Sequence, residues 1–490
     1  MSRALSGKVT RGFAWSAVSN ASMRLGSLLT GVVLARLLVP EEFGVYAIAL
    51  MVQVILINLA ELGLAADLVR HGDLDRRGPT ITTVALGASG TLMVLMWVTA
   101  EPVARLMGSA EAAPVIVVMA LTLPLAGITA VPFAHLQREF QQSKLFMIEA
   151  SNFVVGTVVT ISLVVADWGP ISLAIGRVAG QVVATVLQFH LTGRRFRVGW
   201  QPDIARSGIR FGLPLACAGV LAWTLLNIDT MLVGGVAGAT ALGFYVLAFN
   251  ISSWPSSVIG TAVRAVAFPA FSQRSLESGQ RDVTGVVRAT SVVWAAALPV
   301  AVVLAILADP VIEVVYGQRW LPSAPVLVGL AVFGALRVAF DLWIAYLTAC
   351  GAAGALLWTQ VVWIAALTPA MYLAIQRDGI VGAGWAHVIV AALVMLPVYL
   401  ATMRRYDVPV GALLLGFLPA SLGVLPAAAA GLLVAGLVDN PYLRILAAGS
   451  ALALTYLACM WPWLRTQRRL LKDPPAPVDP APVQTNQEVT

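Results

Sequence analysis

Three arginines stand in the middle of long apolar stretches of this sequence, where a charge is costly. Arg24, Arg177 and Arg337 each lie near the centre of such a stretch. A charged residue at the centre of a membrane helix costs about 2.5 to 3.5 kcal/mol even on a mild scale, so it indicates a function. The planar guanidinium binds phosphate oxygens two at a time and keeps its charge when buried. These residues therefore predict a cavity for an anion.

The alternative for each arginine is an ion pair with a neighbouring carboxylate. Asp341 lies one helical turn after Arg337 on the same face, so both interpretations stay open at that position. No carboxylate lies at helical spacing from Arg24 or Arg177 in the sequence, which favours the cavity for these two residues.

The composition indicates a polytopic membrane protein. Of the 490 residues, 59% are hydrophobic and 11% are charged, whereas about a quarter of the residues in a soluble domain are charged. Unpaired backbone polar groups are not tolerated in hydrocarbon, so the spans must be helices. The three cysteines, Cys217, Cys350 and Cys459, lie in apolar runs and predict no disulfide framework.

A hydropathy window of about 19 residues predicts an all-α fold with about fourteen transmembrane helices. The predicted spans are 12–35, 43–69, 80–100, 114–135, 146–166, 169–190, 208–235, 242–268, 284–308, 322–346, 355–376, 380–402, 410–436 and 442–464. The first stretch carries Arg24 and lacks a cleavage signal, so we interpret it as a retained helix. The Pro-rich end, Lys472 to Thr490, predicts a disordered tail.

The distribution of basic residues orients these spans. Most of the 31 Lys and Arg residues fall in loops on the side of the N-terminus, and the loops of the other side hold Arg36, Arg105, Arg319, Arg377 and Arg444. Positive charge collects in cytoplasmic loops, so both termini are predicted in the cytoplasm. The net charge of +7 then results from the orientation of the chain in the membrane. We expect the basic residues to interact with membrane lipids and not with nucleic acid.

The sequence also contains an internal repeat. "GVYAIA" (44–49) matches "GFYVLA" (243–248) at an offset of 199 residues, and "RRF" (194–196) matches "RRY" (404–406) at 210. Between them, "EPV" (101–103) matches "DPV" (309–311) and "APVIV" (113–117) matches "APVLV" (324–328), in the same order. Two copies of a six-helix unit have the same orientation and predict two lobes related by an axis along the membrane normal.

The repeat divides the chain into an N-lobe (1–200), a C-lobe (201–405), two additional helices (406–466) and a cytoplasmic tail (467–490). A substrate cavity between the lobes, with alternating access by rocking, is the expected arrangement. The alternative is a duplication kept only for the stability of the fold.

Four more residues are candidates for coupling or gating. Asp229 either binds a coupling cation or proton, or counters an arginine, and Glu61 also lies deep in its span. His387 follows Arg177 by 210 residues and is its repeat equivalent. A histidine there titrates near neutral pH, unless it is simply hydrogen-bonded. Asp341 completes the set.

Motifs for nucleotide hydrolysis, metal chemistry and acyl transfer are absent from the sequence, so we expect a protein that is not an enzyme and binds no cofactor. Its residues resemble a known family. "LARLLVPEEFGVYAIA", "LAELGLAADLVR", "LNIDTMLVGGVAGATALGFYVLAFNISSWP" and "AFPAFSQ" are similar to the polysaccharide transporter (Wzx-type lipid-linked oligosaccharide flippase) family of the multidrug/oligosaccharidyl-lipid/polysaccharide exporter superfamily. The resemblance covers roughly residues 8–465.

The resemblance implies two six-helix lobes in a V shape around a cationic cavity. It implies transport of a polyprenyl-pyrophosphate oligosaccharide across the bacterial cytoplasmic membrane for polysaccharide biosynthesis, with glycosyltransferases and a polymerase of the same pathway as further partners. Arg24 and Arg177 suit the binding of the pyrophosphate head by position. Arg36, in the outer turn "RLLVPEEFG", is a further candidate for contact with the emerging headgroup.

Three other functions remain to be compared. A drug or metabolite antiporter of the same fold would centre its cavity on carboxylates and aromatic residues, whereas this chain puts arginines there. An envelope-assembly scaffold without transport would have its deep arginines paired. A polysaccharide polymerase or ligase is disfavoured by the short outer loops.

Overall fold

The computed structural model describes residues 23, 26–60, 64–71, 73–139, 141–278 and 282–472. These residues form helices and connecting turns with no strand, so the predicted all-α membrane fold is confirmed. Among them, twelve helices are long and apolar enough to cross a membrane, and Gly26–Leu37 forms a shorter apolar helix. Most of the first predicted span, including Arg24, and the predicted tail from residue 473 lie outside the described residues.

The helices follow the predicted spans in order. In the N-lobe they are α2 (Pro40–Ala60), α3 (Leu64–His71), α4 (Leu74–Leu106), α5 (Ala112–Ala120), α6 (Thr122–Arg138), α7 (Gln142–Val165) and α8 (Ile171–Thr192). In the C-lobe they are α9 (Pro202–Leu226), α10 (Ile228–Ser278), α11 (Val283–Ile306), α12 (Ala308–Val315), the 3₁₀ helix η1 (Gln318–Ser323), α13 (Ala324–Ala349), α14 (Ala353–Val390), the π-helix η2 (Ala391–Met395) and α15 (Leu396–Arg405). The additional pair is α16 (Val410–Leu437) and α17 (Pro441–Lys472).

Two breaks in the backbone define helix ends more closely than the predicted spans do. The apolar stretch 354–405 contains two predicted spans, and α14 is broken between them at Asp378 and Gly379. The predicted span 208–235 is not one helix, because α9 ends at Leu226 and α10 begins at Ile228. At the break, the Asn227 side-chain amide donates to the Trp223 carbonyl at 2.8 Å. An Asn side chain that bonds nearby backbone competes with helix continuation.

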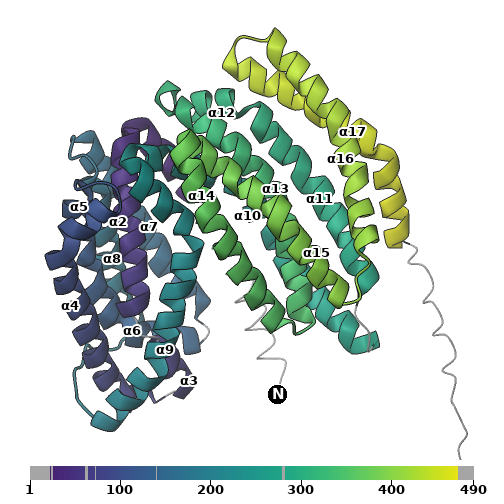
Figure 1. Cartoon of the computed structure of the whole chain (residues 1–490). Helices are drawn as coiled ribbons and strands as arrows, with labels where there is room; N and C mark the ends of the chain where they lie inside the picture. The colour runs from purple at the N-terminus through teal and green to yellow at the C-terminus, as the bar shows by residue number, and fades with distance from the viewer. Residues whose placement is uncertain are drawn as a thin grey trace, which may run out of the picture.

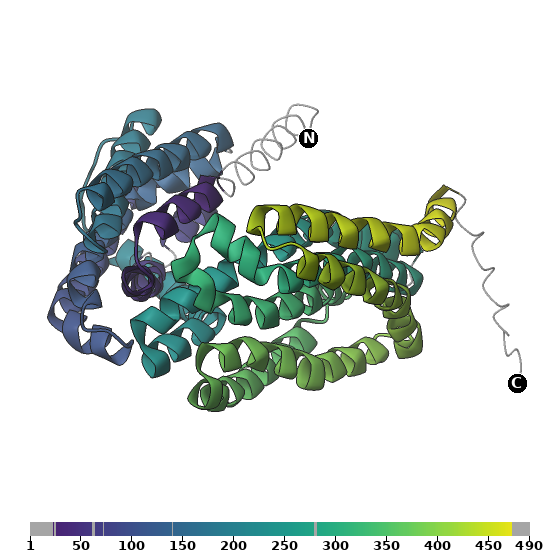
Figure 2. The ribbon, with the colours of Figure 1, turned by 90° about the horizontal axis from the view of Figure 1, so that it is seen from above.

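The helices form two bodies (Figure 1). The N-lobe helices α2 to α8 lie on one side, α10 to α15 lie on the other, and α16 and α17 flank the C-lobe at its outer edge. The view from above shows the same separation (Figure 2). Helix α9, although it belongs to the C-lobe in the repeat, packs against α2, α3 and α4.

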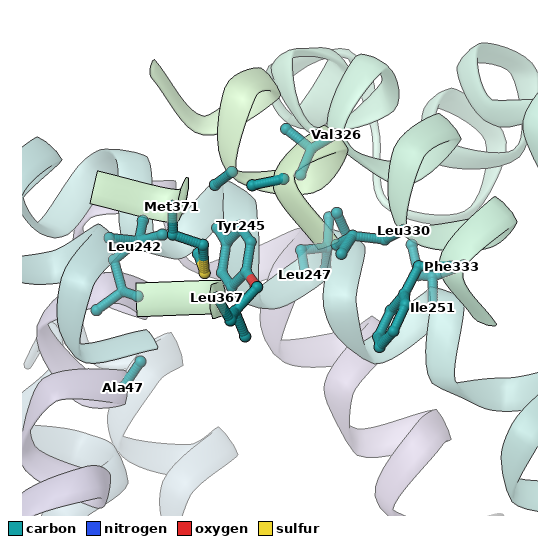
Figure 3. Packing of buried hydrophobic residues seen from close by; sticks show 14 of the residues in the cluster. Ala47, Leu242, Tyr245, Leu247, Ile251, Val326, Leu330, Phe333, Leu367 and Met371 are labelled. Carbon is teal, nitrogen blue, oxygen red and sulfur yellow. The ribbon is translucent and has the colours of Figure 1, made fainter. Parts of the chain in front are cut away.

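The core of the C-lobe is built by α10, α13 and α14 around Tyr245 (Figure 3). Leu242, Leu367 and Met371 are buried with it in the same apolar cluster. One polar pair of the core is the Trp343 indole, which donates to the Thr290 hydroxyl at 3.0 Å. Such pairing is required because no water is present in hydrocarbon to satisfy a polar group.

Candidate functional site

The two lobes meet where their repeat motifs begin, at Gly44 on α2 and Gly243 on α10. A Cβ added to Gly44 would overlap the carbonyl oxygen of Ala239, and one added to Gly243 would overlap that of Pro40. The two contacts are equivalent, since the offset of 199 residues relates both pairs. The predicted pseudo-two-fold axis therefore passes between these glycines, which let the two backbones touch.

A second contact between the lobes lies at the same end of the molecule, next to α12 (Figure 1). Arg36 donates from Nε to the Val315 carbonyl at 2.9 Å and from Nη2 to the Val314 carbonyl. In return, the Trp320 indole of η1 donates to the Ala35 carbonyl at 2.6 Å. We call the group formed by Arg36, Ala35, Trp320 and the α12 carbonyls the latch.

Aromatic packing and a helix dipole stabilise the latch. Trp320 is fully buried and meets Phe43 and Phe244 edge to face, at ring-centroid distances of 5.6 and 5.9 Å. The last carbonyls of α12 carry the negative end of the helix dipole, which a guanidinium complements. Arg36, predicted as a headgroup contact, thus holds the lobes together in this conformation.

We expect Arg36→Gln to open the latch in part. A hydrogen bond to a charged group contributes about 1.5 to 3 kcal/mol to stability when solvent does not reach it. Because Arg36 is exposed, we expect a smaller contribution of about 1 kcal/mol to the closed state. Its loss would lower the ratio of closed to open molecules roughly fivefold. The measurement is the thiol-labelling rate of Ala35→Cys in a chain whose three native cysteines are replaced by alanine, because Ala35 is fully buried and its carbonyl belongs to the latch.

Arg105→Gln is the matched control for this prediction. Arg105 forms an exposed ion pair with Glu101 at 2.6 Å, one turn away on the same helix, and should leave the labelling rate unchanged. Equal rates for Arg36→Gln and the parent chain would contradict a role of Arg36 in closure.

In the N-lobe, the structure places Arg177 near the middle of α8 with an exposed side chain. Its charge lies within electrostatic range of the Tyr46 hydroxyl on α2. Arg177 and Arg337 form no ion pair with any residue that the structure describes. Among the described residues, no carboxylate therefore neutralises the charge of either guanidinium group.

In the C-lobe, a buried polar cluster surrounds Asp229. The Tyr245 hydroxyl donates to Asp229 Oδ2 at 2.9 Å, and His387 Nε2 lies 3.8 Å from the same oxygen. The other ring nitrogen of His387 contacts the Ala383 carbonyl at 3.0 Å. All three residues are at least 95% buried. We call Asp229, Tyr245 and His387 the acid cluster.

The half-buried Arg337 on α13 lies within electrostatic range of His387. Asp341, the alternative partner of Arg337, lies within electrostatic range of Tyr399 instead. Glu61 and Arg24 fall outside the described residues. Within the described ranges, no group of three or more His, Cys, Asp or Glu side chains is placed to hold a metal ion.

Equivalent positions of the two lobes carry different chemistry. The repeat relates Tyr46 to Tyr245 and Arg177 to His387, and the structure brings each tyrosine near its basic residue in both lobes. The equivalent of Asp229 in the N-lobe is Thr30 at the offset of 199. One lobe therefore has a fixed positive charge, and the other has a carboxylate and a titratable imidazole. Sequence reasoning missed both tyrosines, although they stand in the repeat motifs.

The comparisons with known proteins agree with this geometry. Residues 33–325 match the family described as polysaccharide biosynthesis protein. The succinoglycan biosynthesis transport protein ExoT of Rhizobium meliloti is 28% identical over 74% of each chain. The lipopolysaccharide biosynthesis protein WzxC of Escherichia coli is 24% identical, over 67% of this chain and 68% of the relative.

Solved structures share the fold at low identity. The lipid II flippase MurJ, in an inward closed conformation, matches with a TM-score of 0.75 and 15% identity, over 93% of this chain and all of MurJ. A multidrug resistance MATE family transporter in an inward-facing conformation matches with a TM-score of 0.59 and 18% identity, over 78% of this chain and 94% of that one. The two-lobed architecture is thus a known transporter architecture.

Proposed function

The chain belongs to the polysaccharide biosynthesis protein family, within the multidrug/oligosaccharidyl-lipid/polysaccharide exporter superfamily, and from this premise we propose that it flips a polyprenyl-pyrophosphate oligosaccharide across the cytoplasmic membrane. It is a multi-pass membrane transporter for polysaccharide biosynthesis and not an enzyme. The substrate and the route through alternating access are the parts that we propose.

Alternating access is supported by the position of the closure. The latch and the contact of Gly44 with Gly243 lie at the end of the molecule that the arginine distribution assigns to the outside. With the outer end closed, the headgroup enters from the cytoplasm and leaves only after this contact separates. In this topology both termini lie in the cytoplasm of a bacterial cell.

Arg177 is the observation that carries the substrate proposal. An exposed guanidinium in the middle of a membrane helix, without an acidic partner among the described residues, fits a pyrophosphate better than a cationic drug. Arg337 offers a second positive charge from the C-lobe, and Arg24 is expected to add a third. The polyprenyl tail would stay in lipid between the lobes while the head crosses.

The acid cluster is our candidate for the coupling site. The Asp229 carboxylate lies 3.8 Å from the His387 imidazole, so the charge on the imidazole changes the attraction across the pair. The pair lies beside Arg337, so a proton on His387 adds positive charge next to a proposed substrate group. Proton uptake by His387 would therefore favour binding of the anionic headgroup, and proton loss would favour its release.

The test deletes the gene and complements the strain with variants. We expect lipid-linked oligosaccharide to accumulate on the inner leaflet of the deletion strain. Arg177→Ala and Arg337→Ala should each reduce export about 10- to 150-fold, from the loss of hydrogen bonds to a charged group. Arg177→Lys keeps the positive charge but lacks the planar guanidinium that binds two oxygens at once, so it should retain intermediate export.

Arg105→Ala serves as the surface control and should complement fully. Protein level in the membrane is measured for every variant by immunoblot. Full rescue by both Arg177→Ala and Arg337→Ala would exclude the anion cavity. A deletion strain without accumulated lipid-linked oligosaccharide would exclude the flippase.

A further inference from the structure

A cavity of about 310 Å³ lies in the N-lobe, away from the lobe interface and the acid cluster. Its walls come from α4, α6 and α8 and from residues 193–197 of the connector 193–201 between the lobes. Small-molecule sites measure roughly 300 to 1,000 Å³, so this cavity admits a group the size of a phosphorylated headgroup. Leu74, Ile128, Val131 and Phe189 supply an apolar floor.

Positive charge dominates the rim of this cavity. Arg194, Arg195 and Arg197 line it from the connector, and His135 lines it from α6. The Arg194 Nη1 forms an ion pair with Asp75 Oδ1 at 2.9 Å, which leaves the charges of Arg195 and Arg197 in excess. The Arg194 Nε is buried and has no hydrogen-bond partner, so a donor within the site is unused.

The connector is held in place by the helix beneath it. The Gly199 N–H donates to the Thr83 hydroxyl at 3.1 Å, and that hydroxyl lies 2.9 Å from the Gly199 carbonyl. The Gln201 N–H donates to the Thr80 hydroxyl at 3.1 Å. These bonds fix the connector on α4, so the arginines are presented from a defined backbone.

The connector also carries exposed apolar side chains. In "RRFRVGW", Val198 and Trp200 follow the arginines and are 61% and 63% exposed, and Phe196, which also lines the cavity, is 49% exposed. Aromatic residues at the ends of membrane helices lie at the level of the lipid headgroups. A soluble loop would gain nothing from three such exposed side chains, whereas an interfacial connector would bury them in the lipid boundary.

We propose that this cavity binds the phosphate of an anionic phospholipid headgroup, with Arg195 and Arg197 as its ligands and the connector side chains seated in the lipid boundary. The shared chemistry is a phosphoryl group, and the apolar floor together with the exposed aromatic residues favours lipid over soluble phosphate. The inference does not depend on what the chain transports. A bound lipid would fix the connector between the lobes against α4.

The experiment uses the purified full chain in detergent. Native mass spectrometry measures binding of short-chain phosphatidylglycerol and of phosphatidylcholine with the same acyl chains. We expect phosphatidylglycerol to bind at least about tenfold tighter, and Arg195→Gln with Arg197→Gln to remove that preference, because charge-assisted hydrogen bonds are lost. Binding of phosphatidylcholine should not change.

The matched control is Arg404→Gln with Arg405→Gln, the repeat equivalents of Arg194 and Arg195, which are exposed and do not line the cavity. This pair should keep the preference for phosphatidylglycerol. A competition arm adds inorganic phosphate: resistance to displacement supports the lipid source, and displacement at low concentration supports a phosphate site with a soluble ligand. Equal binding of the two lipids to the parent chain, or an equal loss in both double variants, would overturn the proposal.

Discussion

Gly44→Ala and Gly243→Ala are each expected to abolish the outer closure and with it export. The added methyl of either alanine would overlap a carbonyl oxygen of the other lobe, at Ala239 or at Pro40, and backbone atoms cannot swing aside as a side chain does. Overpacking costs about 1 to 3 kcal/mol. Applied to the closed state, this lowers its population roughly 5- to 150-fold.

Two measurements check this expectation. Labelling of Ala35→Cys in the chain without native cysteines should accelerate by the same factor, and glycan export should fall. Gly87→Ala is the control, because a Cβ at Gly87 meets nothing within 4 Å. The labelling rate of the double variant should be only slightly higher than that of each single variant, because one overlap already separates the lobes. Normal labelling and export in both single variants would disprove the contact.

Asp229→Ala should destabilise the C-lobe and stop transport, whereas Asp229→Asn should separate these two effects. Alanine leaves the buried Tyr245 hydroxyl without its acceptor, which costs about 1 to 3 kcal/mol. Asparagine still offers an oxygen to Tyr245 but removes the negative charge opposite His387. We therefore expect near-normal stability with export reduced by more than about tenfold.

Thermal unfolding in detergent measures the first effect, and export in the complemented strain measures the second. Asp309→Asn is a control on the same lobe, because Asp309 begins α12 outside the acid cluster. If Asp229→Asn exported normally, the acid cluster would be a structural feature of the core alone. His387→Gln should lose export in the same way as Asp229→Asn.

Hydropathy and the distribution of charged residues predicted most of the fold. Apolar runs of span length predicted the helices, and the six-residue match of "GVYAIA" with "GFYVLA" located the contact between the lobes, since the small residue needed there begins both motifs. The break at Asn227 escaped prediction because the residues on both sides are apolar and helix-compatible. Pro40 lies between the helix Gly26–Leu37 and α2 and begins α2, where a missing N–H has no cost.

The site was predicted as separate residues and not as an arrangement. Asp229 and His387 were both candidates, but their pairing depends on how α10 packs against α14, which no local pattern encodes. The partners of Arg36 are backbone carbonyls 278 and 279 residues away. Because every residue has a backbone carbonyl, the sequence cannot single out these two. Tyr245 was hidden because an aromatic residue in an apolar helix looks like core.

The packing of α9 against the N-lobe places a change of packing partners at Asn227. Helix α9 packs against α2, α3 and α4, whereas α10 packs against α13 and α14 as well as against α2. If the lobes rock as bodies, the chain would bend between Leu226 and Ile228, where Asn227 departs from helical geometry, and at Gly238, where α10 is broken. Asp229 stands two residues after Asn227. If the acid cluster is the coupling site, as we propose, its carboxylate lies within one helical turn of a point at which the chain would bend.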